Sequence, residues 1–330
     1  EAVTTGPNNT LIGGLAGDSM NTGTRNVAVG KGALGVLTSG TDNVAIGSVD
    51  AAAAEVLGSN ITGNANIAIG GGSLKNYTAS NSLAIGYRAL EANSYGHTNL
   101  SVGNYAGDGI TSGANNIMIG YDCGSYSNNF TTGSQNVCIG HYIIAGGNGD
   151  DYANALGYNL TAHGGYTTLG KGSDDIRASH GSTTWSTVSD ERYKKDIEDA
   201  KAGLSFINAL RPRTFKYKTL GELPETFRAY EADLPKSKEV FKNENTNHGF
   251  IAQEVKQAID ADSDLKDGFR LWDERGDGSQ EIAETALIPM LVKAIQELSA
   301  KNDALETENA TQATQIADLI SRVTALENAE

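Results

Sequence analysis

A hydroxyl group and an amine lie five residues apart in the segment Ser189-Asp-Glu-Arg-Tyr-Lys194. A serine attacks a carbonyl carbon when a base takes the proton of its hydroxyl, and a neutral lysine is such a base. Because the ordinary pKa of a lysine is about 10.4, the neutral form at pH 7 requires burial or a cationic neighbour. Arg192 and Lys195 are near enough in sequence to be that neighbour. The segment therefore predicts a Ser-Lys pair with hydrolytic chemistry.

The same segment also has a purely structural interpretation. Ser189 precedes a polar stretch, and Asp190 and Glu191 suit the first turn of a helix, so Ser189 would be a helix N-cap. A spacing of five residues fits neither one helix face nor one strand face, so a catalytic pair of Ser189 and Lys194 requires a turn between its members. On residue types alone, the N-cap is the favoured interpretation.

The composition of the chain changes close to Ser189. The 330 residues carry a net charge of −15 and include 40 Gly, which are concentrated before residue 190. Up to residue 188 there are 6 Lys and Arg against 12 Asp and Glu, and beyond it 19 against 28. Neither part has a basic patch that could neutralise phosphates, which argues against nucleic-acid binding. No apolar run approaches the ~18 residues of a membrane span, so membrane insertion is not expected.

Before Ser189 a short unit recurs, which consists of a polar residue, an aliphatic, a small residue, a second aliphatic and Gly. The copies are Asn9-Thr-Leu-Ile-Gly13, Asn26-Val-Ala-Val-Gly30, Asn43-Val-Ala-Ile-Gly47, Asn66-Ile-Ala-Ile-Gly70, Ser82-Leu-Ala-Ile-Gly86, Asn99-Leu-Ser-Val-Gly103, Asn116-Ile-Met-Ile-Gly120 and Asn136-Val-Cys-Ile-Gly140, with degenerate copies that end at Gly157 and Gly170. The closing glycines are 17, 17, 23, 16, 17, 17, 20, 17 and 13 residues apart. A short and nearly fixed period predicts a solenoid over residues 1–172.

The alternation within each unit is that of a β-strand, with the two aliphatics on one face and the polar and small residues on the other. A second apolar segment often follows the glycine, as in Lys31-Gly-Ala-Leu34 and Tyr87-Arg-Ala-Leu90, which predicts two short strands per coil. Asn at one register predicts an internal side-chain ladder or a satisfied turn rather than a ligand site. One coil buries little surface, so we expect stacking along the axis, and around a threefold, to supply the core.

Few other side chains suggest chemistry. Cys123 and Cys138 do not make a disulfide framework, and Cys138 stands where other copies have Ala, Ser or Met, which predicts a small buried thiol. The five histidines, at positions 97, 141, 163, 180 and 248, lack metal-ligand spacing, so neither a metal nor a cofactor is expected. The pairs Asp150-Asp151 and Asp174-Asp175 are weak glycosidase candidates, because nothing places them across a cleft.

The residues after 200 predict a non-repetitive α+β module. Leu204, Ile207 and Leu210 are three apart and predict a short helix, which Pro212 stops. The remaining expected elements are a strand at 214–218, a long loop at 219–247, a helix starting within 250–259 and a hairpin at 269–282.

From Leu291 onward the apolar positions alternate by four and three over five heptads, which is the a/d pattern of a coiled coil. The polar layers Asn302, Asn309 and Gln312 weaken this seam and fix its register. Residues 291–330 therefore predict a trimeric coiled coil, the partner state that suits a threefold fibre. A monomeric amphipathic helix is the alternative.

The repeats resemble the head domains of trimeric autotransporter adhesins, and similar repeats occur in bacteriophage fibres. This resemblance implies a mostly β N-terminal half, built as a trimeric parallel β-roll or β-helix solenoid. An α+β chaperone domain and a C-terminal trimeric coiled coil would follow it.

The pattern Ser-Asp-x-Arg-x-Lys-x-Asp-Ile, which spans Ser189 to Ile197, strongly resembles the start of the endosialidase-type intramolecular chaperone domain. These self-cleaving C-terminal domains occur on phage tail spikes and fibres and on some eukaryotic membrane-bound transcription factors. Three further segments match the family in order: Leu210-Arg-Pro-Arg-Thr-Phe-Lys-Tyr217, His248-Gly-Phe-Ile-Ala-Gln-Glu254 and Ala286-Leu-Ile-Pro-Met-Leu-Val-Lys-Ala-Ile295.

The resemblance implies that the chain is cut between Val188 and Ser189, with Ser189 as nucleophile and Lys194 as base. Asp190 and Arg192 would be structural or would support the pair. The resulting domains are the solenoid at 1–172, an extended linker at 173–188, the self-cleaving chaperone at 189–290 and the coiled coil at 291–330.

These observations together predict a segment of a trimeric phage tail fibre or spike for host attachment. The expected partners are two further copies of the chain and a host surface receptor, either a glycan or an outer-membrane component. The expected location is the virion, after folding in the host cytoplasm. The alternatives are a trimeric adhesin whose C-terminal module stays uncut, and a glycan depolymerase with its active site in the repeats.

Overall fold

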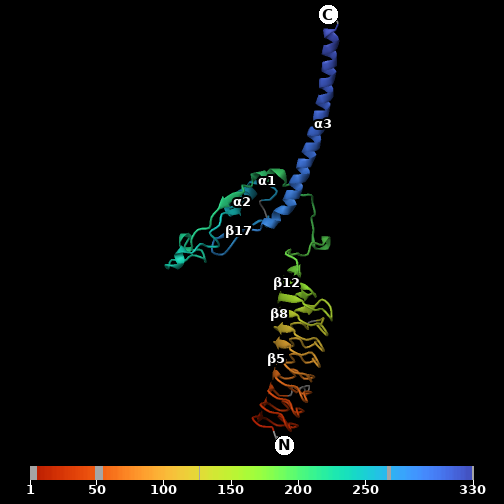
Figure 1. Ribbon diagram of the computed structural model, residues 1–330, viewed down its shortest axis with the longest axis vertical. Coiled ribbons are helices and arrows are strands. Elements are labelled where there is room, and N and C mark those ends of the chain that lie inside the picture. The colour runs from red at the N-terminus through yellow and green to blue at the C-terminus, as the bar shows by residue number, and fades with distance from the viewer. Residues whose placement is uncertain (1–5, 49–54, 126, 266–268, 329–330) are drawn as a thin grey trace. The chain divides into compact units, whose positions relative to one another are not determined.

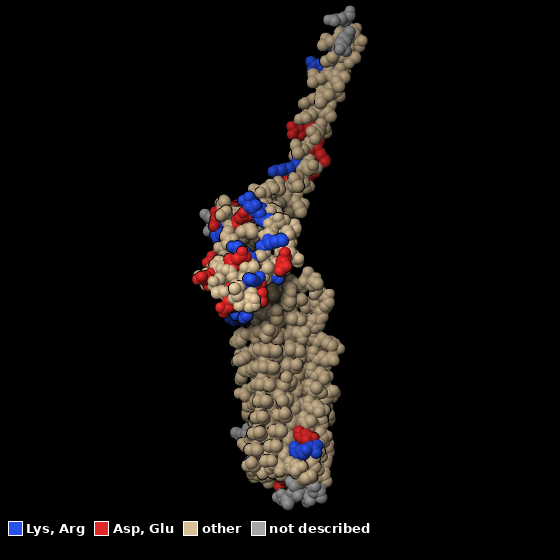
Figure 2. Space-filling view, turned by 60° about the vertical axis from the view of Figure 1, so that its left-hand side comes forward, with Lys and Arg blue, Asp and Glu red and all other residues tan. Residues whose placement is uncertain are grey.

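The computed structural model describes residues 6–48, 55–125, 127–265 and 269–328 (Figure 1). The chain divides into two compact units, Glu1–Lys194 and Lys195–Glu330. Figure 2 shows that charged side chains are sparse on the drawn face of the repeats and frequent on the second unit. The segment from Ser189 to Lys194 is therefore the end of the first unit.

The repeats form a β-solenoid in which each copy adds one parallel strand to a single sheet. The strands are β1 (Thr10–Ile12), β2 (Val27–Val29), β3 (Val44–Ile46), β4 (Ile67–Ile69), β5 (Leu83–Ile85), β6 (Leu100–Val102), β7 (Ile117–Ile119), β8 (Val137–His141), β10 (Asn154–Tyr158) and β12 (Tyr166–Lys171). Equivalent residues of the repeat align, as Ala28 does with Ala45 and Ala45 with Ala68. The predicted solenoid is confirmed, and its degenerate copies are included.

The interior of each coil is narrow and takes small side chains from the strand centres. Ala28, Ala68 and Ala84 are fully buried there, whereas the aliphatic residues that flank them face outward and are partly exposed. Met118 fills the same place in a later coil, and Gly124 makes room for it, because a Cβ on Gly124 would lie 2.6 Å from the Met118 sulfur. The coils that have alanine at these three positions carry a buried leucine where that coil has Gly124. The strand-centre residue and the corner residue thus fill one space of fixed volume, so a larger side chain at one place goes with a smaller one at the other.

The second strand predicted for each coil is wrong for most of the described coils. Leu34 and Leu90, in the segments that suggested it, lie in turns with φ angles of 52° and 53°. This left-handed conformation is incompatible with an extended strand. The apolar residues there pack inward at a corner. Second strands form in two late coils, as β9 (Ile144–Ala145) and β11 (Thr161–Ala162), which pair in parallel.

Buried asparagines tie each coil to the next, so the predicted ladder is confirmed. The backbone N–H of Asn43 donates to Asn26 Oδ1 (2.9 Å), and Asn43 Oδ1 accepts from the backbone N–H of Asn66 (3.0 Å). Asn43 Nδ2 also donates to the carbonyl oxygen of Gly63 (2.8 Å), which lies in a turn. The same pattern of bonds recurs at Asn99, Asn116 and Asn136. The ladder satisfies buried backbone groups that strand pairing does not reach.

Where Ser82 replaces asparagine, a tyrosine completes the ladder. Ser82 Oγ donates to the Tyr77 hydroxyl (2.9 Å), and that hydroxyl donates to the carbonyl oxygen of Ser80 (2.7 Å). Burial raises the pKa of Tyr77, so the phenol stays protonated and able to donate. The shorter serine is therefore compensated within its own coil.

The closing glycines stack at the strand ends, where no larger residue fits. Gly86 has a φ of +138°, and a Cβ added to it would lie 2.3 Å from the carbonyl oxygen of Gly103 in the next coil. Conformation and contact both require glycine at this place.

The solenoid ends in an antiparallel hairpin. Strand β13 (Asp174–Ser179) pairs with β12, and Arg177 in β13 forms an antiparallel bridge with Ser186. Residues 173–188, predicted as an extended linker, are thus extended but partly paired with the sheet.

The second unit packs helices α1 (Leu204–Ala209) and α2 (Ala252–Ala261) with the first part of α3 (Ile288–Glu327) and two antiparallel strand pairs. Strand β14 (Arg213–Phe215) pairs with β15 (Asn247–Gly249) across a long connection, and β16 (Trp272–Glu274) forms a hairpin with β17 (Gln280–Ile282). The 3₁₀ turns are η2 (Leu220–Glu222), η3 (Lys236–Lys238) and η4 (Glu284–Leu287). The core includes Phe206, Val255 and Ile259. The predicted helices and the hairpin at 269–282 are confirmed. Strand β15 was not predicted, because Asn-His-Gly has no strand pattern.

Replacing one ladder residue should destabilise the solenoid. In Asn43→Ala the backbone N–H of Asn66 and the carbonyl of Gly63 lose their side-chain partners while remaining buried. We expect a loss of about 2–4 kcal/mol in unfolding free energy, seen as a lower midpoint of chemical unfolding. The control is Asn76→Ala, which removes the same side chain from an exposed position. Equal midpoints for the two variants would contradict the ladder's role.

Candidate active site

The Ser189 hydroxyl and the Lys194 amine lie next to each other. Lys194 Nζ donates to Ser189 Oγ over 2.9 Å, and the 3₁₀ turn η1 (Glu191–Tyr193) occupies the residues between them. A turn of this kind is what the five-residue spacing requires. Both side chains are exposed, so within the single chain nothing excludes water from the pair. The catalytic role of the pair stays a prediction.

Asp190, rather than Ser189, is the N-cap of the turn. Its Oδ1 accepts from the backbone N–H of Arg192 (2.9 Å). The Arg192 guanidinium binds the same carboxylate through Nε (2.9 Å) and a terminal nitrogen (2.7 Å). These bonds from Arg192 hold the pKa of Asp190 below its ordinary value. The alternative in which Ser189 caps a helix is therefore wrong, and the Ser189 hydroxyl is left to contact Lys194.

The pairing with Asp190 also changes the expected role of Arg192. Sequence proximity made Arg192 a candidate cation beside Lys194, yet its guanidinium is neutralised by the Asp190 carboxylate and its side chain is 86% exposed. The two residues hold the turn between Ser189 and Lys194 together.

The segment before Ser189 is attached to the terminal hairpin. The backbone N–H of Arg177 donates to the carbonyl oxygen of Ser186 (2.9 Å), and the N–H of Ser186 donates back to the carbonyl of Arg177 (2.8 Å). The Thr187 hydroxyl donates to the carbonyl oxygen of Asp175 (3.0 Å). Val188, on the acyl side of the predicted cut, comes next in the chain.

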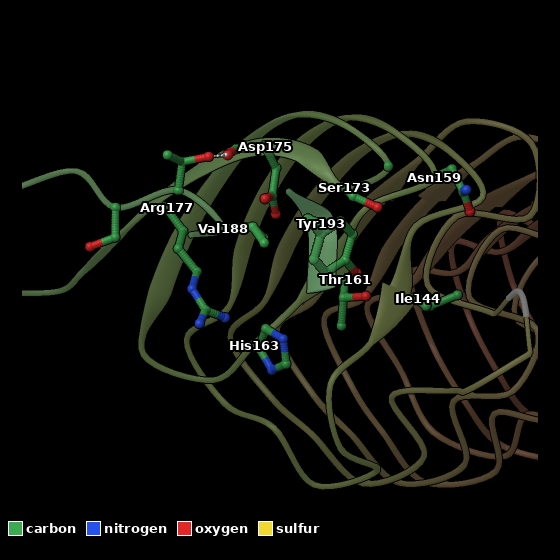
Figure 3. A pocket seen from close by; sticks show the side chains of 12 residues that line it. Ile144, Asn159, Thr161, His163, Ser173, Asp175, Arg177, Val188 and Tyr193 are labelled. Atoms are coloured by element: carbon green, nitrogen blue, oxygen red, sulfur yellow. Dashed lines mark hydrogen bonds between the residues drawn. The ribbon is translucent and has the colours of Figure 1, made fainter. Parts of the chain in front are cut away.

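A cavity of about 430 Å³ opens beside this attachment (Figure 3). Its walls come from the last coils, through Thr161 and His163, and from the hairpin, through Arg177. Val188 and Tyr193 also line it. These neighbours of the site could not be predicted from the sequence, because the hairpin brings together residues that no repeat or motif connects.

The remaining candidate residues lie where they support the fold and do not form a reactive site. Cys123 and Cys138 are free and buried, as predicted for Cys138, and burial raises the pKa of Cys123 to about 12, so the thiol stays protonated. Asp151 accepts from the backbone N–H of Ser134 (2.6 Å). Asp174 and Asp175 are consecutive residues of β13, so their side chains point to opposite faces and do not flank one bond.

Across the described ranges, no group of three or more His, Cys, Asp or Glu side chains is arranged to hold a metal ion. No helix within the described residues is both long and apolar enough to span a membrane.

One family of known proteins matches part of the chain, and the match starts at the site. Residues 189–263 match the sequence model of a peptidase family described as chaperone of endosialidase, a family of self-cleaving intramolecular chaperones. The match begins at Ser189 itself and includes the segments at 210–217 and 248–254, whereas Ala286–Ile295 lies beyond its end. Searches of curated proteins and of solved structures found no match to the chain.

The cap at Asp190 gives a prediction about the turn. Asp190→Ala removes the acceptor of the Arg192 N–H, and we expect self-cleavage to slow about fivefold, in line with ~1 kcal/mol for an N-cap. Asp190→Asn keeps a side-chain oxygen and should cleave close to the wild-type rate. The fraction of cut chain is followed against time on denaturing gels. If both variants match wild type, the capped turn does not hold the pair.

Proposed function

We propose that the chain is a segment of a trimeric tail fibre or tail spike of a bacteriophage, whose C-terminal module guides folding and then releases itself. The cut lies between Val188 and Ser189, and the chemistry is that of a Ser-Lys peptidase acting once on its own chain. The fibre attaches to a host receptor, either a glycan or an outer-membrane component. It folds in the host cytoplasm and functions on the virion.

One observation carries the proposal. The first residue that matches the self-cleaving family, Ser189, is also the residue whose hydroxyl accepts a hydrogen bond from Lys194. The turn that brings them together is capped from within the segment by Asp190. Nucleophile, base and cleavage point thus lie within one short stretch at the end of the solenoid unit.

The reaction needs a neutral Lys194, which reverses the direction of its hydrogen bond with Ser189. The amine takes the hydroxyl proton, Oγ bonds to the carbonyl carbon of Val188, and the C–N bond to Ser189 breaks as the lysine returns the proton to nitrogen. An ester of Val188 on Ser189 Oγ results, beside a free α-amine. One water then adds to the ester carbonyl and yields the Val188 carboxylate and the restored hydroxyl.

Intact mass after expression tests the cleavage directly. We expect wild type to give two pieces, residues 1–188 and 189–330, while Ser189→Ala and Lys194→Ala stay whole because each lacks one partner of the reaction. Lys201→Ala is the matched control, since it removes another exposed lysine that has no part in the pair, and it should be cut. A wild-type chain that stays whole as a stable trimer would overturn the proposal.

The outward face of the solenoid sheet supports assembly of several copies. Aliphatic residues flank each strand centre and align from strand to strand, so that Ile119, Ile139 and Leu156 follow one another along the sheet. Ile139 is 38% exposed and Leu156 54% exposed in the single chain. A continuous apolar column on a surface is the kind of patch that another protein covers, and identical chains offer identical columns.

Helix α3 supports the same assembly. Among its a and d residues, Ile295, Leu305 and Leu319 are more than half exposed in the single chain. Heptads of exposed aliphatics on a continuous helix are buried when helices of other copies pack against them. Two separated parts of the chain therefore present apolar surfaces that a trimer would cover.

A charge on the outward column should prevent assembly. Ile139→Asp places a carboxylate within the apolar surface, and we expect it to shift the protein from trimer to monomer or aggregate in sedimentation velocity. Ile61→Asp is the control, because Ile61 is 53% exposed in a turn outside the sheet. If Ile139→Asp assembles like wild type, the column is not the interface.

A second candidate function is a trimeric adhesin whose module stays attached. The exposure of both Ser189 and Lys194 favours it, because a lysine that acts as a base is held away from solvent and nothing within the single chain shields this pair. The intact-mass experiment separates this candidate from the first.

A further inference from the structure

We infer that the terminal hairpin of the solenoid positions the scissile bond, and that Thr187 is the positioning residue closest to it. This inference rests on the proposed self-cleavage between Val188 and Ser189. It gives the solenoid a part in the reaction. Thr187 and the hairpin lie before Ser189, where the family match begins.

The acyl side of the bond is held by three hydrogen bonds. Ser186 exchanges two backbone bonds with Arg177, and the Thr187 hydroxyl donates to the carbonyl oxygen of Asp175. The last of these bonds lies one residue before the carbonyl carbon of Val188. A catalytic pair accelerates attack only when the carbon is held in reach of the nucleophile, and a displacement of about 1 Å can slow a reaction ~100-fold.

The chain beyond the bond returns to the same cavity. Val188 and Tyr193 line one cavity with Arg177 and His163, so the residue before the serine and the residue before the lysine lie against the same wall (Figure 3). Between them, Asp190 caps the turn. The segment is therefore anchored by hydrogen bonds on its acyl side, Tyr193 borders the same cavity, and Lys194 Nζ lies 2.9 Å from Ser189 Oγ.

This arrangement makes cleavage depend on the end of the solenoid. The carbonyl of Asp175 and the backbone of Arg177 are in place when β13 pairs with β12, and β12 in turn pairs with β10. A chain whose last coils have not formed lacks the surface that holds Thr187 and Val188. Cleavage then follows completion of the solenoid.

The test compares cleavage rates in the full chain. Thr187→Val removes the hydroxyl with little change in shape, and we expect cleavage about fivefold slower, which corresponds to ~1 kcal/mol for one hydrogen bond. Thr187→Ser restores the hydroxyl and should restore the rate. Thr183→Val, at an exposed position in the same stretch, is the matched control and should cleave like wild type.

Two further readouts distinguish positioning from loss of structure. The dependence of the cleavage rate on pH should be unchanged in Thr187→Val, because the hydroxyl takes no part in proton transfer. The midpoint of solenoid unfolding should also be unchanged, because the variant removes only one exposed hydrogen bond at the end of the solenoid. If wild type cleaves and Thr187→Val cleaves at the same rate, the inference is wrong while the proposed function stands. If wild type itself stays uncut, the proposed function fails and the inference falls with it.

Discussion

The strand of each coil turns its small side chain inward, because the space between the strand and the opposite corner is too narrow for more. Alanine fills that space in half of the solenoid strands, and methionine enters at Met118 where glycine replaces the leucine of the corner. The strand centres bury little apolar surface, the corner leucines add to the core, and hydrogen bonds between coils help to define the stacking. The buried asparagines supply them, and they link the side-chain amide of each coil to the backbone of the next.

The same constraint decides where the larger aliphatic residues lie. If alanine faces inward, the valines and isoleucines on either side of it face outward, since neighbouring residues of a strand point to opposite faces. A globular protein would cover this face with another layer of its own chain. In the described solenoid this face is a column of partly exposed side chains. The aliphatic heptad residues of α3 are likewise exposed in the single chain. Under the proposed function, the other copies of the chain are the covering layer.

Much of the fold could be predicted from the sequence, because the repeat sets the register of every strand and the asparagine column. The alternation of Val and Ala alone is symmetric with respect to inside and outside, so only the asparagines and Cys138 pointed to the small-residue face as the inner one. The corner leucines were mistaken for strands because their left-handed backbone leaves no mark on an apolar pattern. At the site, Ser189, Lys194 and Asp190 are local and were identified by motif. Thr187 and Tyr193 gain their neighbours through the β12–β13 hairpin, a contact that no periodic pattern encodes.

Under the proposed function, the anchoring of Ser186 and Thr187 to the solenoid explains why a fibre would cut itself at this place. A solenoid of many coils that must also register with other copies folds slowly and exposes apolar columns while it does so. A module that aligns the chains is useful during that period, and its removal afterwards leaves a product that cannot retrace its folding path. Such a cut has to come late. Because the holding strand β13 depends on β12, and β12 on the coil before it, the geometry that presents Val188 to Ser189 arises at the end of solenoid folding. In the proposed function, the hydrogen bonds of the fold itself would then set the order of events.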